Sequence, residues 1–175
     1  MATKTISFTL DASSINKAIK ELKKYSDDFE QKVIRLRQLI GERIAWSASR
    51  GFSTALAADV VMGTPEPVQV EVTVCHPFRN LTCVIAEGDQ AVFIEFGAGV
   101  YNNGAAGSSP HPWGPENGYL IGTYGKGKGK RKTWGYYKRD QEVVVTHGTP
   151  AAMPMFRGVQ DAMRVFDSLV QEVFG

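Results

Sequence analysis

Apolar residues recur every three or four positions over the first third of the chain, as they do in amphipathic helices. This spacing predicts two helices. Asp11 or Ser13 can cap the first, and the second covers residues 27–50, with Gly51 as its C-terminal stop. The second helix would be about 36 Å long at ~1.5 Å per residue, and its charged side chains are interpreted as a solvated face. The apolar positions of the two helices are Ile15, Ile19, Leu22, Phe29, Val33, Leu36, Ile40 and Ile44.

The middle of the chain alternates apolar and polar residues with a period of two, which is typical of strands. Glu95 is the one acid in an apolar run. An outward-facing position is the simpler interpretation of it, and a buried acid is the alternative. Residues 154–174 return to helical spacing, with Pro154 suited to a first turn. The predicted strands span residues 5–10, 68–75, 81–87, 91–96, 134–138 and 143–146.

The grouping of these elements predicts the fold class. Because the strands are grouped and do not alternate one-for-one with helices, we expect an α+β fold. Its antiparallel sheet would pack against the long N-terminal helix and the C-terminal helix, since both helices have an apolar face that needs a partner. We expect a single domain over residues 1–175, because domains cluster near ~100–150 residues.

A glycine-rich insertion at residues 101–133 interrupts this pattern and has almost no periodicity. Loops of this length inside a compact domain are usually functional, or disordered until they meet a partner. Five of its positive charges fall at Lys126, Lys128, Lys130, Arg131 and Lys132. Aromatic residues follow directly, and basic residues beside aromatic ones can grip a phosphate backbone. Three interpretations stay open: contact with DNA, docking on an acidic protein surface, and a solvated flexible tip.

The composition is that of an ordinary globular protein, with 43% apolar and 22% charged residues. A net charge of +2 excludes a protein that coats nucleic acid with its whole surface. No apolar run approaches the ~18–20 residues that span a bilayer, and the start lacks the apolar block of a signal peptide. We therefore expect cytoplasmic synthesis and no membrane partner. Cys75 and Cys83 are too few for a disulfide scaffold and are expected to be reduced.

No segment has the residues and spacing of a catalytic or metal site. Residues 122–129 approach a phosphate-binding loop, but Gly129 stands where Ser or Thr must hold magnesium, and a basic segment follows instead of a helix. His76, His111 and His147 lie in three separate loops without acids at ligand spacing, which favours turn and capping roles. We therefore expect no enzyme activity, no cofactor and no bound metal.

Residues 91–99, Ala-Val-Phe-Ile-Glu-Phe-Gly-Ala-Gly, resemble a signature of phage neck proteins of the gene-product-ten-like family. These are the tail-completion or head–tail joining proteins of long-tailed phages. In that family a glycine-rich loop follows, then an aromatic strand, then a Gly-x-x-Ala/Pro-x-Pro-Phe segment before the last helix. Residues 134–137 and 148–156 match these positions, although Met155 separates Pro154 from Phe156 and the loop is longer and more basic than expected. The matching residues are Glu95, Phe96, Gly97, Gly99, Trp134, Gly148, Pro154 and Phe156.

The resemblance implies a non-enzymatic virion protein, made in the host cytoplasm and incorporated at the head–tail neck. Such proteins form homo-oligomeric rings, here expected to be hexamers or dodecamers, around the DNA channel. Their partners are the adaptor, the terminator and the tail tube, and a ring needs a heterologous interface that closes on itself. Loop residues expected to contact a partner or DNA are Trp113, Tyr119, Tyr124, Lys126, Lys128, Lys130, Arg131 and Lys132.

Other functions stay open beside this one. Some relatives of the family are tail terminators or minor tail proteins, which would share the subunit fold. A more distant alternative is a small module that binds DNA non-specifically through residues 126–132. A phage enzyme such as a nuclease is weaker still. Without its five loop charges the chain has a net charge of −3, which favours the assembly protein over the DNA-binding module.

Overall fold

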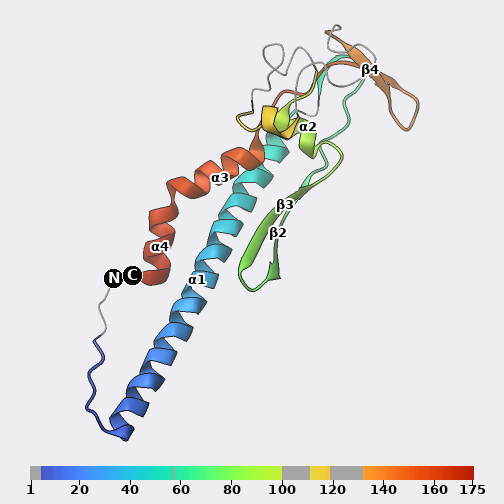
Figure 1. Cartoon of the computed structure of the whole chain (residues 1–175). Helices are drawn as coiled ribbons and strands as arrows, with labels where there is room; N and C mark the ends of the chain where they lie inside the picture. Colours follow the sequence, from blue (N-terminus) through green and yellow to red (C-terminus); the bar gives the residue numbers. More distant parts are fainter. Residues whose placement is uncertain (1–4, 57, 100–110, 119–131) are drawn as a thin grey trace.

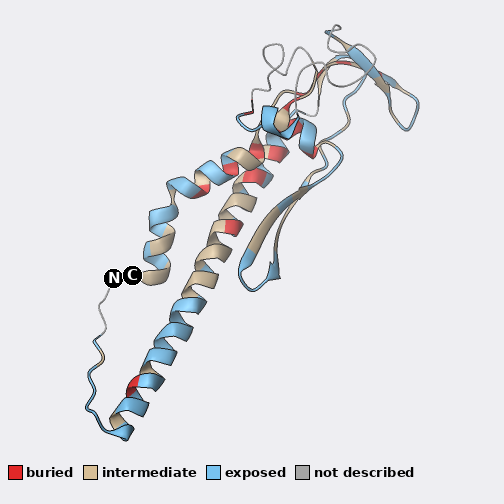
Figure 2. Ribbon diagram, in the orientation of Figure 1, coloured by how far each residue is buried: buried red, intermediate tan, exposed pale blue. Residues whose placement is uncertain are grey.

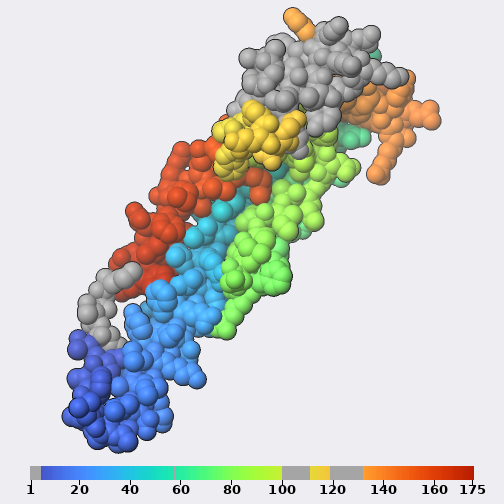
Figure 3. All heavy atoms as spheres, viewed as in Figure 1, coloured from blue at the N-terminus to red at the C-terminus, as the bar shows by residue number. Residues whose placement is uncertain are grey.

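The computed structural model describes residues 5–56, 58–99, 111–118 and 132–175 (Figure 1). It has an α+β fold in which a long N-terminal helix packs on antiparallel strands and on C-terminal helices. The molecule is elongated along that helix (Figure 3). None of the helices in these four described ranges is long and apolar enough to cross a membrane.

Helix α1, Ala12–Thr54, is one continuous helix of 43 residues, about 65 Å long at ~1.5 Å per residue. The prediction of two helices separated near residue 27 is wrong, because the sequence there holds no Gly or Pro that would break the helix. Asp11 caps it as predicted, since its carboxylate accepts a hydrogen bond from the Ser14 N–H at 2.9 Å. Gly51 does not end the helix. A Cβ there would lie 2.7 Å from that of Pro154, so Gly51 admits a close helix crossing.

Two helices run back along α1 (Figure 1). They are α3, Pro154–Arg164, and α4, Phe166–Phe174. The sequence predicted one helix here, but the backbone leaves helical geometry at Val165, with φ −103° and ψ 7°. The ring of Phe174 contacts that of Phe29 with centroids 5.7 Å apart. The part of α1 before this contact projects beyond α4 (Figure 1).

A two-stranded antiparallel hairpin packs against α1, formed by β2, Glu71–Phe78, and β3, Leu81–Glu87. The prediction of strand pairing is confirmed, although β2 starts at residue 71 and extends through Phe78. Cys75 lies opposite Cys83, and both are free thiols as predicted. A separate sheet has the order β1-β5-β4. Its strands are β1, Asp59–Met62, β4, Trp134–Tyr137, and β5, Val143–Gly148. No strand forms over described residues 5–10.

The run at 91–96, predicted as a strand, is instead the short helix α2, Ala91–Phe96. Apolar runs of this length do not distinguish a strand from a helix. Ala91, Ile94 and Glu95 are buried while Val92 is exposed, which is the spacing of a helix face. Ile94 and Ala91 join Phe52 of α1 in the buried core of the molecule. Figure 2 shows that burial is concentrated where α1, α2 and α3 meet.

Candidate functional site

The side chain of Glu95 is buried, although an outward-facing position was the simpler prediction. One carboxylate oxygen, Oε2, accepts a hydrogen bond from the Met155 N–H at 2.8 Å. The other, Oε1, accepts from the Phe156 N–H at 2.9 Å. These are N–H groups in the first turn of α3, whose own N-cap residue, Met153, provides no side-chain hydrogen bond. Glu95 therefore caps α3 from α2, and its negative charge faces the positive end of a helix dipole.

His111 is the third hydrogen-bond partner of the Glu95 carboxylate. It is 1% exposed, and its Nε2 lies 3.0 Å from Glu95 Oε1. Its Nδ1 accepts a hydrogen bond from the Trp113 N–H at 3.0 Å, so the proton of a neutral ring is on Nε2 and is donated to Glu95. The imidazole ring packs between Phe96, at 4.5 Å between centroids, and Phe156, at 5.3 Å. We call Glu95, Phe96, His111, Trp113 and Phe156 the Glu95 cluster.

A backbone bridge beside the cluster joins the end of α2 to the end of β5. The Ala98 N–H donates to the Thr149 carbonyl at 2.8 Å, and the Thr149 N–H donates to the Ala98 carbonyl at 3.0 Å. Gly148 has φ +111°, and a Cβ on it would lie 1.9 Å from the Ala98 oxygen. Only glycine fits at this position. Gly97 and Gly99 flank Ala98: a Cβ on Gly99 would lie 2.4 Å from the His147 carbonyl oxygen, and one on Gly97 would lie 3.1 Å from the Ala151 Cβ.

The Glu95 cluster joins α2, the first turn of α3 and the turn at His111. Both oxygens of the carboxylate accept hydrogen bonds, both ring nitrogens of His111 are engaged, and the imidazole is almost fully buried. A general acid or base must reach a proton on a substrate, and neither side chain is exposed enough to do so. The sequence signal was an isolated acid in an apolar run, which does not identify its partner 60 residues further along the chain.

The structure brings together most residues that carry the family resemblance. Glu95, Phe96, Gly97 and Gly99 meet Gly148, Pro154 and Phe156 around the cluster and its backbone bridge. Trp134 stands apart. It lies on β4, opposite Thr146, with its ring 5.7 Å from that of Tyr136.

Part of the predicted partner-binding loop is ordered against the Glu95 cluster. Residues 111–118 form turns and a short 3-10 helix, η1, Pro115–Asn117, so this part of the insertion is not structureless as predicted. Trp113 is 48% exposed and packs edge-on against Phe156 at 5.1 Å. Lys132 is exposed. The other predicted contact residues lie outside the described residues: Tyr119, Tyr124, Lys126, Lys128, Lys130 and Arg131.

The two remaining histidines make local contacts. His76 Nδ1 lies 3.1 Å from the Thr82 hydroxyl, and His147 Nδ1 lies 3.2 Å from a carboxylate oxygen of Asp59. Among the residues that the structure describes, no three His, Cys, Asp or Glu side chains gather in a way that could hold a metal ion.

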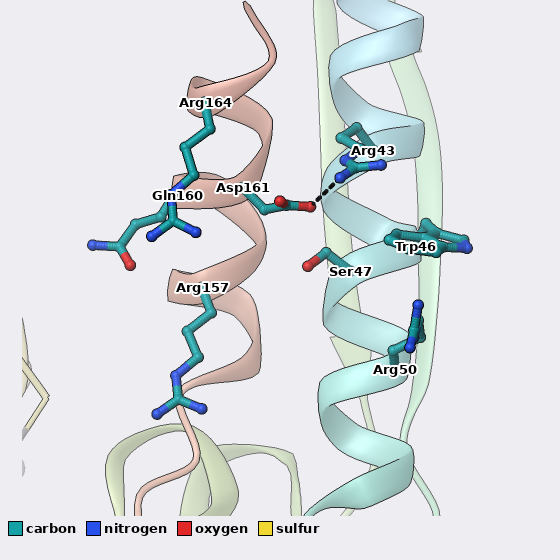
Figure 4. Close-up of a pocket in the computed structure, with 8 residues that line it drawn as sticks. All are labelled: Arg43, Trp46, Ser47, Arg50, Arg157, Gln160, Asp161 and Arg164. Carbon is teal, nitrogen blue, oxygen red and sulfur yellow. Dashed lines mark ion pairs between the residues drawn. The ribbon is translucent and has the colours of Figure 1, made fainter.

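A groove between α1 and α3 is a second candidate site, which the sequence did not predict (Figure 4). Its volume is about 410 Å³. Arg43 forms an ion pair with Asp161 at 2.8 Å. The guanidinium carbons of Arg43 and Arg50 lie 4.8 Å and 4.9 Å from the centroid of the Trp46 ring. The groove is lined by Arg43, Trp46, Ser47, Arg50, Arg157, Gln160, Asp161 and Arg164.

The signal for this groove was a shared spacing. Arg43 and Arg50 are seven residues apart on one helix, and Arg157 and Arg164 are seven apart on the other. This spacing places each pair on one helix face, two turns apart. The charged face of α1 is therefore not only solvated, because α3 carries the same spacing and lies beside it.

Comparison of the chain with protein-family models, with curated proteins and with solved structures finds no match.

Proposed function

We propose that the protein is a structural subunit of the head–tail neck of a long-tailed phage, and that its copies pack into a closed ring around the DNA channel. The observation that carries the proposal is a row of exposed apolar side chains on the projecting half of α1. They are between 36% and 57% exposed and recur at helical spacing, so they share one helix face. We call this row the α1 stripe: Ile15, Ile19, Leu22 and Tyr25, with Phe29, whose ring contacts Phe174, at its inner end.

The α1 stripe favours a function in assembly. Single exposed apolar residues are normal on protein surfaces, but a contiguous row is typical of an interaction surface. The row lies at one end of an elongated subunit (Figure 3). A surface at one end can pack against a different surface of the next copy, which is the heterologous contact that ring closure requires.

The Glu95 cluster supports the choice of the neck family. Most residues of the resemblance hold α2 against the start of α3 by hydrogen bonds and close glycine contacts. The role we propose needs a rigid subunit and no catalytic turnover, which agrees with a Glu–His pair whose atoms are all engaged. A tail terminator or minor tail protein would use the same subunit and differ in its position along the tail.

Negative-stain imaging and mass photometry of the purified protein test the proposal, alone and with its neck partners. We expect rings in the wild type. The double variant Ile19→Glu/Leu22→Glu should remain monomeric with an unchanged melting temperature, because both side chains are exposed in the subunit. Asn16→Glu/Gln31→Glu is the matched control, since it adds the same charge at exposed positions of the same helix outside the stripe. Wild type that stays monomeric with its partners, or stripe variants that form normal rings, would refute the proposal.

A further inference from the structure

We infer that the groove between α1 and α3 binds the phosphodiester backbone of nucleic acid through the guanidinium groups of Arg50, Arg157 and Arg164. The inference goes beyond the proposed neck function, because it depends on this groove alone and holds whether or not the subunits form rings. It is also separate from the basic segment 126–132, which shares no residue with the groove.

The groove concentrates positive charge. Four arginines and one carboxylate line it, so it carries three net positive charges, whereas the whole chain carries +2. Arg43 is the arginine paired with that carboxylate, Asp161. No carboxylate of the described residues lies within 4.0 Å of the charged nitrogens of Arg50, Arg157 or Arg164. All three residues are exposed, so their guanidiniums can pair with an anion from outside the chain.

Trp46 fixes the position of the arginines on α1. The guanidiniums of both Arg43 and Arg50 lie over its ring, at 4.8 Å and 4.9 Å from the centroid. Such cation–π contacts hold a long, flexible side chain in place. Arg50 is therefore oriented before a ligand arrives, which lowers the entropic cost of binding.

The arginines form two parallel rows (Figure 4). Because α1 and α3 run antiparallel, Arg50 and Arg157 lie at one end of the groove while Arg43 and Arg164 lie at the other (Figure 4). Residues seven apart on a helix are separated by ~10.5 Å along its axis. The two arginines of each row can therefore contact different phosphates of an extended strand. The groove thus fits an extended anion with several regularly spaced charges.

The chemistry of the lining favours phosphate groups over other anions. The guanidinium fork donates two parallel hydrogen bonds to phosphate oxygens, and Ser47 and Gln160 add neutral donors beside it. Seven of its eight lining residues are charged or polar, unlike the largely apolar lining of a pocket that holds a small metabolite. An open, polar, arginine-lined surface is what backbone contact with nucleic acid requires.

Fluorescence anisotropy with a labelled DNA duplex and a labelled single strand of the same sequence tests the inference over a range of salt concentrations. The triple variant Arg50→Gln/Arg157→Gln/Arg164→Gln keeps residues of good helix propensity. At low salt we expect it to bind duplex at least ~10-fold more weakly than wild type, and its log–log salt slope to be shallower by ~3. Thermal melting confirms that it is folded. The Arg→Lys version of the triple variant should regain part of the binding.

The matched control is Lys17→Gln/Lys20→Gln/Lys24→Gln, which removes the same charge from exposed positions on the same long helix. It should retain most of the affinity. The inference is overturned if wild type binds neither DNA, if control and groove variants weaken binding equally, or if only Lys126→Gln/Lys128→Gln/Lys130→Gln abolishes it. It is also overturned if the groove variant binds DNA normally but loses self-association, because the groove would then receive an acidic protein surface.

Imaging the same variants by negative stain separates the inference from the neck proposal. Rings that persist when DNA binding is lost would leave the neck proposal standing and support a separate role for the groove. DNA binding by a protein that never forms rings would support the groove and refute the neck proposal.

Discussion

The two ends of α1 have the same apolar periodicity and opposite surroundings. At its C-terminal end, Phe52 is 1% exposed and Ala48 is 0% exposed. At its N-terminal end, Ile19 is 57% exposed and Leu22 is 56% exposed. Figure 2 shows this change along the helix. Periodicity therefore identifies an apolar face, but other elements of the fold decide whether that face is covered. The covered end stabilises the subunit, and the uncovered end is the surface that we propose for assembly.

The largest expected effect lies at the covered end, in the Glu95 cluster. Glu95→Ala removes the acceptor of three buried donors, the N–H groups of Met155 and Phe156 and the Nε2–H of His111. Each unsatisfied donor costs ~1–3 kcal/mol, so the loss of three acceptor contacts should lower the free energy of unfolding by about 3–9 kcal/mol in urea titrations. Glu95→Gln keeps one acceptor oxygen and should lose less. A loss below ~1 kcal/mol for Glu95→Ala would show that the cluster does not hold α2 to α3.

A matched pair on α1 tests the comparison itself. Phe52→Ala leaves a cavity in the core and should lower the free energy of unfolding by ~3–5 kcal/mol. Leu22→Ala at the exposed end should change it by less than ~0.5 kcal/mol in the free subunit. Equal losses at the two positions, measured by urea unfolding of the monomer, would mean that the projecting half is covered within the subunit.

Alanine substitutions at two glycines with positive φ should differ in their cost to stability, by less than the pair on α1. Gly148, with φ +111°, would place a Cβ 1.9 Å from the Ala98 oxygen, whereas Gly118, with φ +79°, has open space around that position. Gly118→Ala should cost only the backbone strain of ~1–2 kcal/mol. Gly148→Ala must also displace the backbone bridge and should cost clearly more. Equal melting temperatures for the two variants would show that the backbone bridge between Ala98 and Thr149 does not stabilise the fold.

The smallest effect is expected outside α1, at the turn between β4 and β5. The Lys138 ammonium, 2.9 Å away, and the Thr64 N–H lower the pKa of the Glu142 carboxyl from its ordinary value. A lowered pKa in the folded state means that Glu142 stabilises the fold fully above the ordinary glutamate pKa. This contribution is lost as the pH falls through the folded-state pKa. Glu142→Gln should flatten the acid limb of the stability curve slightly, and an unchanged limb would contradict the contribution.

Local patterns predicted the elements that are long or clearly alternating. The helix after Asp11, the strand pairs and the last helix with Pro154 at its first turn were all evident in the sequence. The second helix start expected at residue 27 was wrong, because the sequence there holds no Gly or Pro that interrupts the helix. These outcomes follow from interactions within a few residues.

Sites formed between distant segments could not be predicted in this way. Glu95 caps a helix 60 residues further along the chain, so its burial depends on tertiary packing. The arginine groove needs α3 to lie antiparallel to α1, which neither helix pattern contains by itself. The resemblance nevertheless marked Glu95, Gly148 and Phe156 as special residues before the structure supplied a physical reason.

Hydrogen–deuterium exchange on free and assembled protein tests most directly the claim that one end of α1 serves the fold and the other serves assembly. In the free subunit, amides near Phe52 and in α2 should be strongly protected, and amides over residues 12–29 weakly protected. In assembled rings the protection of residues 12–29 should rise, while that of α2 should stay the same. Equal protection of residues 12–29 in the free and assembled states would contradict the account.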